Sequence, residues 1–346
     1  MSTFADALLR WFDQSGRHDL PWQHPRSPYR VWLSEIMLQQ TQVSSAIDYF
    51  ERFVLALPDL PALAAGDLDR VLALWSGLGY YSRARNLHRA ARICVEQHDG
   101  DLPRDIDALL ALPGIGRSTA GAILAQAFEL PFPILDGNVK RVLSRQLGLH
   151  DWPGLRDVER QLWQASEARL PPQRLADYTQ ALMDLGATVC RRQRPRCGEC
   201  PVAQACIARQ EGLQADIPAR KPRRETPERA TFMLWITDRQ GKIMLQQRPA
   251  TGVWGSLWSL PEAQTTPDAE ALAKRYGAMR TDASPICFQH VFSHFKLNVT
   301  ALRFCAERPV TRVSDAASEA WFTHADLGGL GLPAPVRRLL ANCQES

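Results

Sequence analysis

Four of the eight cysteines in this 346-residue chain lie within one short segment. They are Cys190, Cys197, Cys200 and Cys206, with the spacing C-x6-C-x2-C-x5-C. Four thiolates this close together can surround one thiophilic metal centre. Zinc ribbons usually carry two C-x2-C pairs and this segment carries one, so the spacing alone leaves a zinc ion and an iron-sulfur cluster as alternatives.

Two carboxylates have surroundings that would separate their ionisation states. Glu35 shares a helical face with apolar residues such as Val31 and Trp32, which would raise its pKa. Asp136 directly precedes a predicted helix that contains Asn138, and the helix dipole would keep its carboxylate ionised. Such an unequal pair can cleave a glycosidic bond through an oxocarbenium-like state. The structural alternatives are a surface glutamate and a helix N-cap.

The stretch Leu109–Asn138 leads to this aspartate and predicts a helix, a tight turn and a second helix. Pro113 ends the first helix, and Gly114 and Gly116 let the backbone turn where side chains would clash. The second helix is predicted to start near Ser118. Its first backbone amides would then point outward as an anion site, although an ordinary helical hairpin gives the same pattern.

Two further stretches of the sequence carry side chains that suit nucleic-acid binding. The segment Leu72–Asn86 places two glycines before two tyrosines and two arginines, a combination that suits phosphates and stacked bases. A helix junction with core tyrosines is the alternative. Gln39, Gln40 and Gln42 follow Glu35 closely, and their amides could bond a base edge.

The composition is that of an ordinary globular protein, with 45% hydrophobic and 23% charged residues, and the length allows two or three domains. No run of about eighteen apolar residues is present, and the first residues indicate an amphipathic helix rather than a signal peptide. We therefore expect a cytoplasmic protein. The net charge is only +4, but residues 190–229 contain ten Arg or Lys and only five acidic residues. This local excess of positive charge indicates either a solvated linker or a surface that contacts phosphates.

The last third of the chain changes character. Residues 231–236 and 242–247 alternate like the strands of a hairpin, and 295–301 alternate again, around a helical pattern at 268–276. Together they predict an α+β module. The predicted parts are an all-α domain over 1–209, a linker over 210–229 that is rich in Pro, Arg and Glu, and the α+β domain over 230–346.

These motifs together resemble the adenine DNA glycosylases (MutY type) of the endonuclease III superfamily. The resemblance rests on the hairpin with Asp136, on the runs 32–42 and 135–143, and on the cysteine spacing. It implies an all-α helix-hairpin-helix core, a [4Fe-4S] cluster held by the four cysteines, and a carboxyl-terminal Nudix-like domain. The cluster is thus preferred over zinc on the resemblance.

The resemblance also implies roles for individual residues. Glu35 would protonate the adenine ring, and Gln40 would contact that base. Asp136 would act on the sugar whose bond is cleaved, and Asn138 would orient Asp136. Tyr80 would wedge into the duplex. The implied phosphate contacts are Gly114, Gly116 and Ser118, and the implied 8-oxoguanine contacts are Phe292, Ser293 and His294.

The sequence departs at two places from the motifs of related enzymes, and both departures bear on the predicted activity. Lyases of this superfamily carry a lysine at the position of Ser118, so no Schiff base can form there and water should accept the sugar. The stretch Pro261–Gly277 lacks the clustered glutamates of a Nudix catalytic box, which indicates a recognition module. Packed aromatics around a turn would also explain residues 292–294.

We therefore predict a monofunctional, monomeric glycosylase that excises adenine opposite 8-oxoguanine or guanine in double-stranded DNA. One alternative is an endonuclease III-like glycosylase and lyase for oxidised pyrimidines. Ser118 in place of the lyase lysine and the additional carboxyl-terminal domain argue against this alternative. The other is a non-enzymatic iron-sulfur protein that binds DNA or senses redox state. It leaves Glu35 and Asp136 without a shared purpose.

Overall fold

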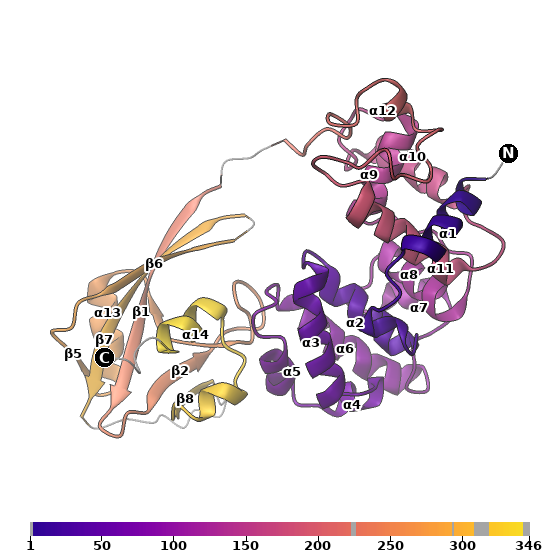
Figure 1. The fold of residues 1–346 in the computed structure, drawn as a ribbon. Coiled ribbons are helices and arrows are strands. Elements are labelled where there is room, and N and C mark those ends of the chain that lie inside the picture. The colour runs from indigo at the N-terminus through magenta and orange to yellow at the C-terminus, as the bar shows by residue number, and fades with distance from the viewer. Residues whose placement is uncertain (1–2, 223–225, 293, 308–317, 342–346) are drawn as a thin grey trace. The chain divides into compact units, whose positions relative to one another are not determined.

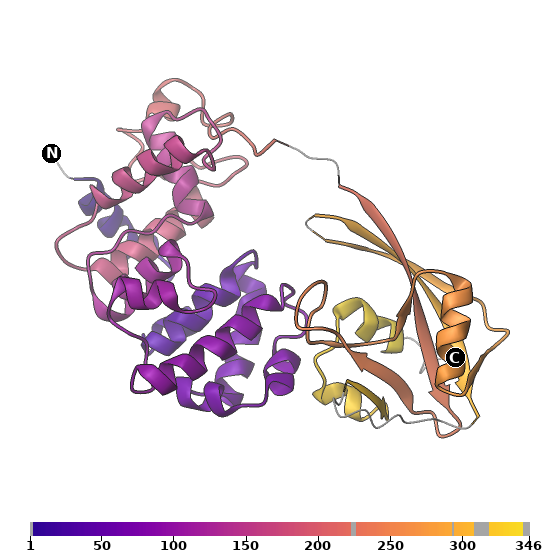
Figure 2. The same cartoon turned by 180° about the vertical axis from the view of Figure 1, so that it is seen from behind.

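The computed structural model describes residues 3–222, 226–292, 294–307 and 318–341. Its contacts divide the chain into two compact units (Figures 1 and 2). The first unit comprises residues 1–65 and 86–223, and the second comprises residues 66–85 and 224–346. Among the described residues, no helix is both long and apolar enough to cross a membrane.

The first unit is built from helices (Figure 1). Helix α2 packs against α8, and α11 packs against both α8 and α1. Helices α1, α9, α10 and α11 share a hydrophobic core that includes Phe12, Leu143, Leu162, Tyr178 and Leu182. The elements are α1 (Phe4–Ser15), η1 (Pro21–Gln23), α2 (Pro28–Leu38), α3 (Val43–Ala56), α4 (Leu60–Ala65), most of α6 (Ser82–Gln97), α7 (Ile106–Ala111), α8 (Arg117–Phe128), α9 (Gly137–Leu147), α10 (Arg156–Glu167), α11 (Leu175–Asp184), η2 (Leu185–Val189) and α12 (Ile207–Gln210).

Local sequence signals explain where several of these helices start. Thr3 forms a capping box with Asp6 at α1, and the Ser27 hydroxyl accepts from the Arg30 amide at α2. Asp105 accepts from the Ala108 amide at 2.9 Å and caps α7. Each cap satisfies an amide that the first helical turn leaves unpaired.

The second unit contains one mixed sheet with the order β3-β2-β1-β7-β5, in which β4 joins β1, β6 joins β7 and β8 joins β2. The long strands β1 and β7 run parallel, from Glu228 beside Lys296 to Asp238 beside Ala306. The elements are α5 (Leu68–Leu74), β1 (Glu228–Asp238), β2 (Ile243–Gln247), β3 (Trp258–Ser259), β4 (Glu262–Ala263), α13 (Thr266–Arg275), β5 (Ala278–Arg280), β6 (Ile286–Val291), β7 (Lys296–Ala306), β8 (Glu319–Phe322), η3 (Asp326–Gly329) and α14 (Ala334–Ala341). The predicted fold class, a helical core followed by an α+β domain, is confirmed.

Residues 66–85 lie in the second unit, whereas the sequence analysis placed them in the domain 1–209. Long-range hydrogen bonds hold them there. The Tyr81 hydroxyl donates to the Leu332 carbonyl at 3.1 Å, and Trp258 Nε1 donates to Asp69 at 3.2 Å. The residues joined by each bond lie far apart in the sequence, so no local sequence pattern predicts these bonds.

The predicted linker 210–229 is ordered at both ends. Ile217 is buried, and the Ala219 amide donates to the His150 carbonyl at 2.9 Å, so these residues pack on the first unit. At the other end β1 begins at Glu228. A composition rich in Pro and Arg therefore did not exclude fixed contacts.

Candidate active site

Glu35 lies on α2, and its side chain is partly buried among the helices of the first unit. Burial raises the pKa of Glu35 to about 8, and the nearby Asp136 contributes to the shift. One hydrogen bond opposes it, because Gln126 Nε2 on α8 donates to Glu35 Oε1 at 3.2 Å. Glu35 therefore holds a proton at neutral pH, and the alternative of a solvated surface glutamate does not apply.

Asp136 caps α9, as the sequence indicated. Its Oδ1 accepts from the Val139 amide at 2.8 Å, and Asn138 Nδ2 donates to its Oδ2 at 3.4 Å. Burial is the largest cause acting on this carboxyl group and raises the pKa of Asp136, while the donors of the helix terminus and Arg141 oppose it.

The two carboxyl groups differ in the interactions that stabilise their ionised forms. Asp136 receives donors from the α9 terminus and faces a guanidinium, whereas Gln126 is the hydrogen-bond donor identified at Glu35. Hydrogen bonds and positive charge stabilise the ionised form. When the pair loses its first proton, the charge therefore resides on Asp136 and Glu35 stays protonated.

Neighbouring helices fix the segment that carries Asp136. A Cβ atom at Gly121 of α8 would lie 2.3 Å from the Pro133 carbonyl oxygen, so only glycine allows this approach. The Ser118 hydroxyl accepts from the Leu135 amide at 2.9 Å, and the Ser166 hydroxyl donates to the Ile134 carbonyl at 2.8 Å. The carboxylate is therefore held on a rigid support.

Asn138 is itself anchored. Arg141 Nη2 donates to Asn138 Oδ1 at 2.8 Å and to the Gly186 carbonyl at 2.7 Å. A Cβ at Gly186 would lie 2.6 Å from the Asn138 Cβ. The amide group of Asn138 therefore has a fixed orientation, with its nitrogen directed at Asp136.

The hairpin between α7 and α8 has the predicted form with one difference. Gly114 adopts φ +83°, which suits glycine, and a Cβ there would lie 2.9 Å from that of Asn86. Gly116 has φ −98° and would meet no atom within 4 Å, so its own backbone does not require glycine. It caps α8, which starts at Arg117 and has no side-chain cap. The uncapped amides and the open space suit an approaching anion.

Gln40 lies just after α2, between that helix and α3. Its backbone is left-handed, with φ +60°. Non-glycine residues in this region are uncommon and gather at functional sites. The conformation is consistent with a constrained side chain near the end of the helix that carries Glu35.

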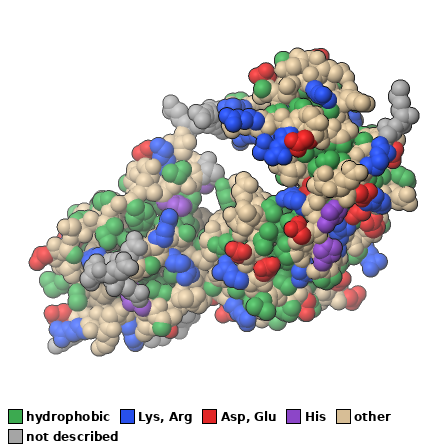
Figure 3. Space-filling view, viewed as in Figure 1, with side chains coloured by type: hydrophobic (Ala, Val, Ile, Leu, Met, Phe, Trp, Pro, Cys, Tyr) green, Lys and Arg blue, Asp and Glu red, His purple; other side chains and the backbone are tan. Residues whose placement is uncertain are grey.

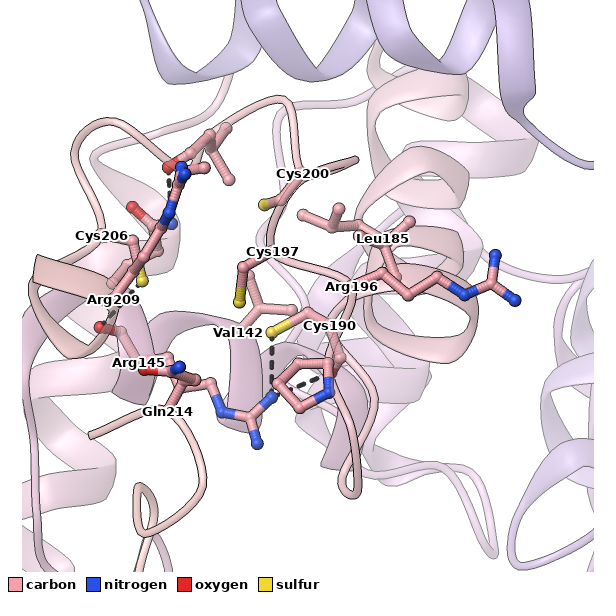
Figure 4. Close-up of a pocket in the computed structure, with 15 residues that line it drawn as sticks. Val142, Arg145, Leu185, Cys190, Arg196, Cys197, Cys200, Cys206, Arg209 and Gln214 are labelled. Carbon is pink, nitrogen blue, oxygen red and sulfur yellow. Dashed lines mark hydrogen bonds between the residues drawn. The ribbon is translucent and has the colours of Figure 1, made fainter. Parts of the chain in front are cut away.

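The four cysteines predicted as ligands line one pocket in the first unit (Figure 4). Burial is the largest cause that raises the pKa of Cys200, to about 11, and the pKa of Cys206 is raised as well. Arg145 is buried beside them, and its Nη1 donates to Cys190 Sγ at 3.3 Å. Thiolates in this pocket need positive charge, which bound metal would supply.

Four cysteine side chains around one pocket form the kind of donor set that an iron-sulfur cluster uses. In a [4Fe-4S] cluster each thiolate binds a different iron, so the sulfurs stand farther apart around a larger centre. Cys190, Cys197, Cys200 and Cys206 are the residues that would hold it.

The remaining predicted residues gather in the second unit. Tyr80 has φ +48° and is 46% exposed, and Arg83 donates to the preceding carbonyls of Leu78 and Gly79 at 3.1 and 3.2 Å. Tyr80, Phe292 and His294 line the same pocket. Ser293 lies outside the described residues. The structure thus brings together groups more than 200 positions apart in the sequence.

Sequence reasoning missed Gln126, Arg145 and Arg83. All three are polar side chains that the structure buries. Gln126 had a readable signal, since it is a polar residue in the otherwise apolar run of α8. The two arginines had none, because arginine is common on helix surfaces.

The fold and the partly buried carboxylate pair point to a class of protein. Residues 33–168 match the model of the "HhH-GPD superfamily base excision DNA repair protein", and residues 232–342 match that of the "NUDIX domain". The solved structure of a thermostable thymine-DNA glycosylase is similar with TM-score 0.55 and 26% identity, and covers 60% of this chain and 95% of its own. The first unit is thus a helix-hairpin-helix glycosylase fold.

Relatives along the full length define the family. The adenine DNA glycosylase of Buchnera aphidicola subsp. Acyrthosiphon pisum is 35% identical over 99% of this chain and 98% of its own. The human adenine DNA glycosylase is 34% identical over 98% of this chain and 73% of its own. The chain belongs to the adenine DNA glycosylase family.

Proposed function

We propose that this protein hydrolyses the N-glycosidic bond of adenine mispaired with 8-oxoguanine or guanine in double-stranded DNA, as a monomer. The observation that carries the proposal is the pairing of a protonated Glu35 with Asp136 in a member of this family. A glycosylase must extrude the nucleotide to reach the bond. Tyr80 is the exposed aromatic side chain suited to fill the vacated stack.

The chemistry follows from the different charges of the two groups. Glu35 donates its proton to the adenine ring, which makes the base a better leaving group. Asp136, oriented by Asn138, stabilises the positive charge that develops on the sugar. Water then adds to the sugar and leaves an abasic site.

Basic side chains support DNA binding. A pocket in the first unit is lined by seven Lys or Arg residues and one acidic residue, Asp216, and Figure 3 shows such side chains gathered at this end of the unit. Phosphate contacts of this kind position a duplex without reading its sequence. The basic residues are Lys140, Arg141, Arg145, Arg192, Arg194, Arg220 and Lys221.

The direct test uses duplexes with one defined mispair. We expect free adenine from duplexes with adenine opposite 8-oxoguanine or guanine, and none from adenine opposite thymine. Release of an oxidised pyrimidine instead would favour the endonuclease III-like alternative. Binding without any base release would favour the non-enzymatic one.

The absence of an amine at residue 118 predicts a monofunctional reaction. The Ser118 hydroxyl accepts a backbone hydrogen bond and offers no Schiff base. Borohydride should therefore trap almost no covalent complex with DNA during adenine release. Efficient trapping by the unaltered protein would contradict the prediction, and Ser118→Lys serves as the comparison that should increase strand cleavage.

The cysteine pocket predicts the metal content. Purified protein should be yellow-brown and contain about four irons per chain, because four thiolates complete one [4Fe-4S] cluster. Iron analysis and the visible absorption spectrum measure this directly. Cys200→Ser should reduce the iron content, whereas Cys94→Ser, a buried cysteine outside the pocket, should not. Stoichiometric zinc without visible absorption would reject the cluster.

A further inference from the structure

The turn between β6 and β7 is anchored through Phe292. The Phe292 amide donates to the Phe295 carbonyl at 2.8 Å and closes the turn. The Phe292 ring stacks on Phe295, with centroids 4.5 Å apart and planes 19° apart, and meets His290 edge-on at 4.5 Å. His294 is exposed on the same turn. The His294 ring centroid lies 6.2 Å from that of Phe292 and 4.9 Å from that of Phe295, so its position depends on how these two rings pack.

Trp254 supplies a packing surface from another segment, the loop between β2 and β3. Its ring centroid lies 5.4 Å from that of Phe292 and 5.6 Å from that of His290. Trp254 is only 7% exposed, and its backbone is left-handed with φ +54°. A bulky residue keeps this conformation only when its surroundings enforce it.

Two arginines provide that enforcement. Arg248 Nε donates to the Val253 carbonyl at 2.8 Å, and the same guanidinium forms an ion pair with Glu262. Arg85 Nη1 donates to the Gly255 carbonyl at 2.6 Å. Arg85 belongs to the segment that also carries Tyr80, so the Trp254 loop connects that segment to the β6–β7 turn within one unit.

We propose that Trp254 is a positioning residue that fixes Phe292, and through it His294, for reading the base opposite the adenine. The inference rests on the proposed function. Trp254, Tyr80 and His294 line one pocket, so a base held there would meet the turn that Trp254 supports. 8-Oxoguanine differs from guanine by an oxygen at C8 and a hydrogen at N7. Discrimination then depends on one or two hydrogen bonds, which weaken steeply when misaligned.

The test compares two tryptophans of similar burial. Trp254→Ala removes the proposed support. Trp235→Ala is the control, because Trp235 is 5% exposed against 7% for Trp254 but lies under the Arg303 guanidinium, with 5.1 Å to the ring centroid, and does not line the pocket. For each full-length variant, single-turnover rate constants are measured for adenine opposite 8-oxoguanine and opposite guanine. Their ratio cancels a general loss of folded protein.

We expect the ratio to fall about ten-fold in Trp254→Ala, as for the loss of one specific base contact. Trp254→Phe should retain most of the ratio, and Trp235→Ala should retain all of it. Arg85→Met, which removes the bond to Gly255, should lower the ratio in the same direction and serves if Trp254→Ala does not fold.

An unchanged ratio in both Trp254→Ala and Arg85→Met would overturn the proposal. An equal fall in Trp235→Ala would also overturn it, since the effect would then be a general one on the unit. Failure of the proposed function itself has a different signature, because the unaltered protein would release adenine from neither mispair.

Discussion

Asp136→Asn should lose base excision while it still binds the mispair. Removing the carboxylate leaves the developing charge on the sugar without its nearest negative partner, and we expect the single-turnover rate constant to fall on the order of a thousand-fold. Asparagine is as good an N-cap as aspartate, so α9 should start as before. Phosphate contacts elsewhere persist, and the dissociation constant for a duplex carrying the mispair should change little.

Asp105 offers the matched control for this substitution. It is also an N-cap aspartate of the first unit, accepting from the Ala108 amide, but it is exposed on α7. Asp105→Asn should excise adenine at the normal rate. Near-normal excision by Asp136→Asn would show that another carboxylate serves the sugar, and loss of duplex binding would show that Asp136 acts through the structure of the site.

Glu35→Gln should likewise abolish most excision, by about 10²- to 10⁴-fold, because glutamine cannot donate a proton to the leaving base. In the unaltered protein the pKa of Glu35 is raised from 4.5 to about 8. A general acid works while protonated, so excision should fall as the pH rises through about 8. An unshifted glutamic acid would already have lost activity near pH 4.5. The measurement is the single-turnover rate constant from pH 5 to pH 9.

Gln126 supplies the check on this assignment. Its hydrogen bond to Glu35 favours the carboxylate and lowers the pKa, so Gln126→Leu should move the alkaline limb to higher pH. The residual activity of Glu35→Gln should show no such limb. A limb that stays in place in both variants would mean that a different group titrates near pH 8.

Short-range patterns in the sequence were enough for several parts of this protein. The Pro-Gly-x-Gly hairpin and the N-cap at Asp136 each depend on residues a few positions apart, and their geometry is largely set by dihedral preferences and local hydrogen bonds. The four cysteines were recognisable as one motif because they lie close together in the sequence. The alternating strands and the separate carboxyl-terminal domain were readable for the same reason.

The tertiary structure decided the properties that depend on distant contacts. Glu35 could have been a surface residue, and its raised pKa comes from burial by other helices and from Asp136, a hundred positions away. Desolvation also raises the pKa of Asp136, against the donors of its own helix terminus. Residues 66–85 joined the second unit through hydrogen bonds to residues such as Leu332.

The physical reason is the sequence distance between the residues that determine each property. A helix start or a turn is encoded by neighbours along the chain, whereas desolvation depends on which atoms exclude water, and those come from anywhere in the sequence. The sequence by itself therefore determined which residues could do chemistry here. Only the folded chain decided which carboxyl group keeps its proton and which loop Trp254 supports.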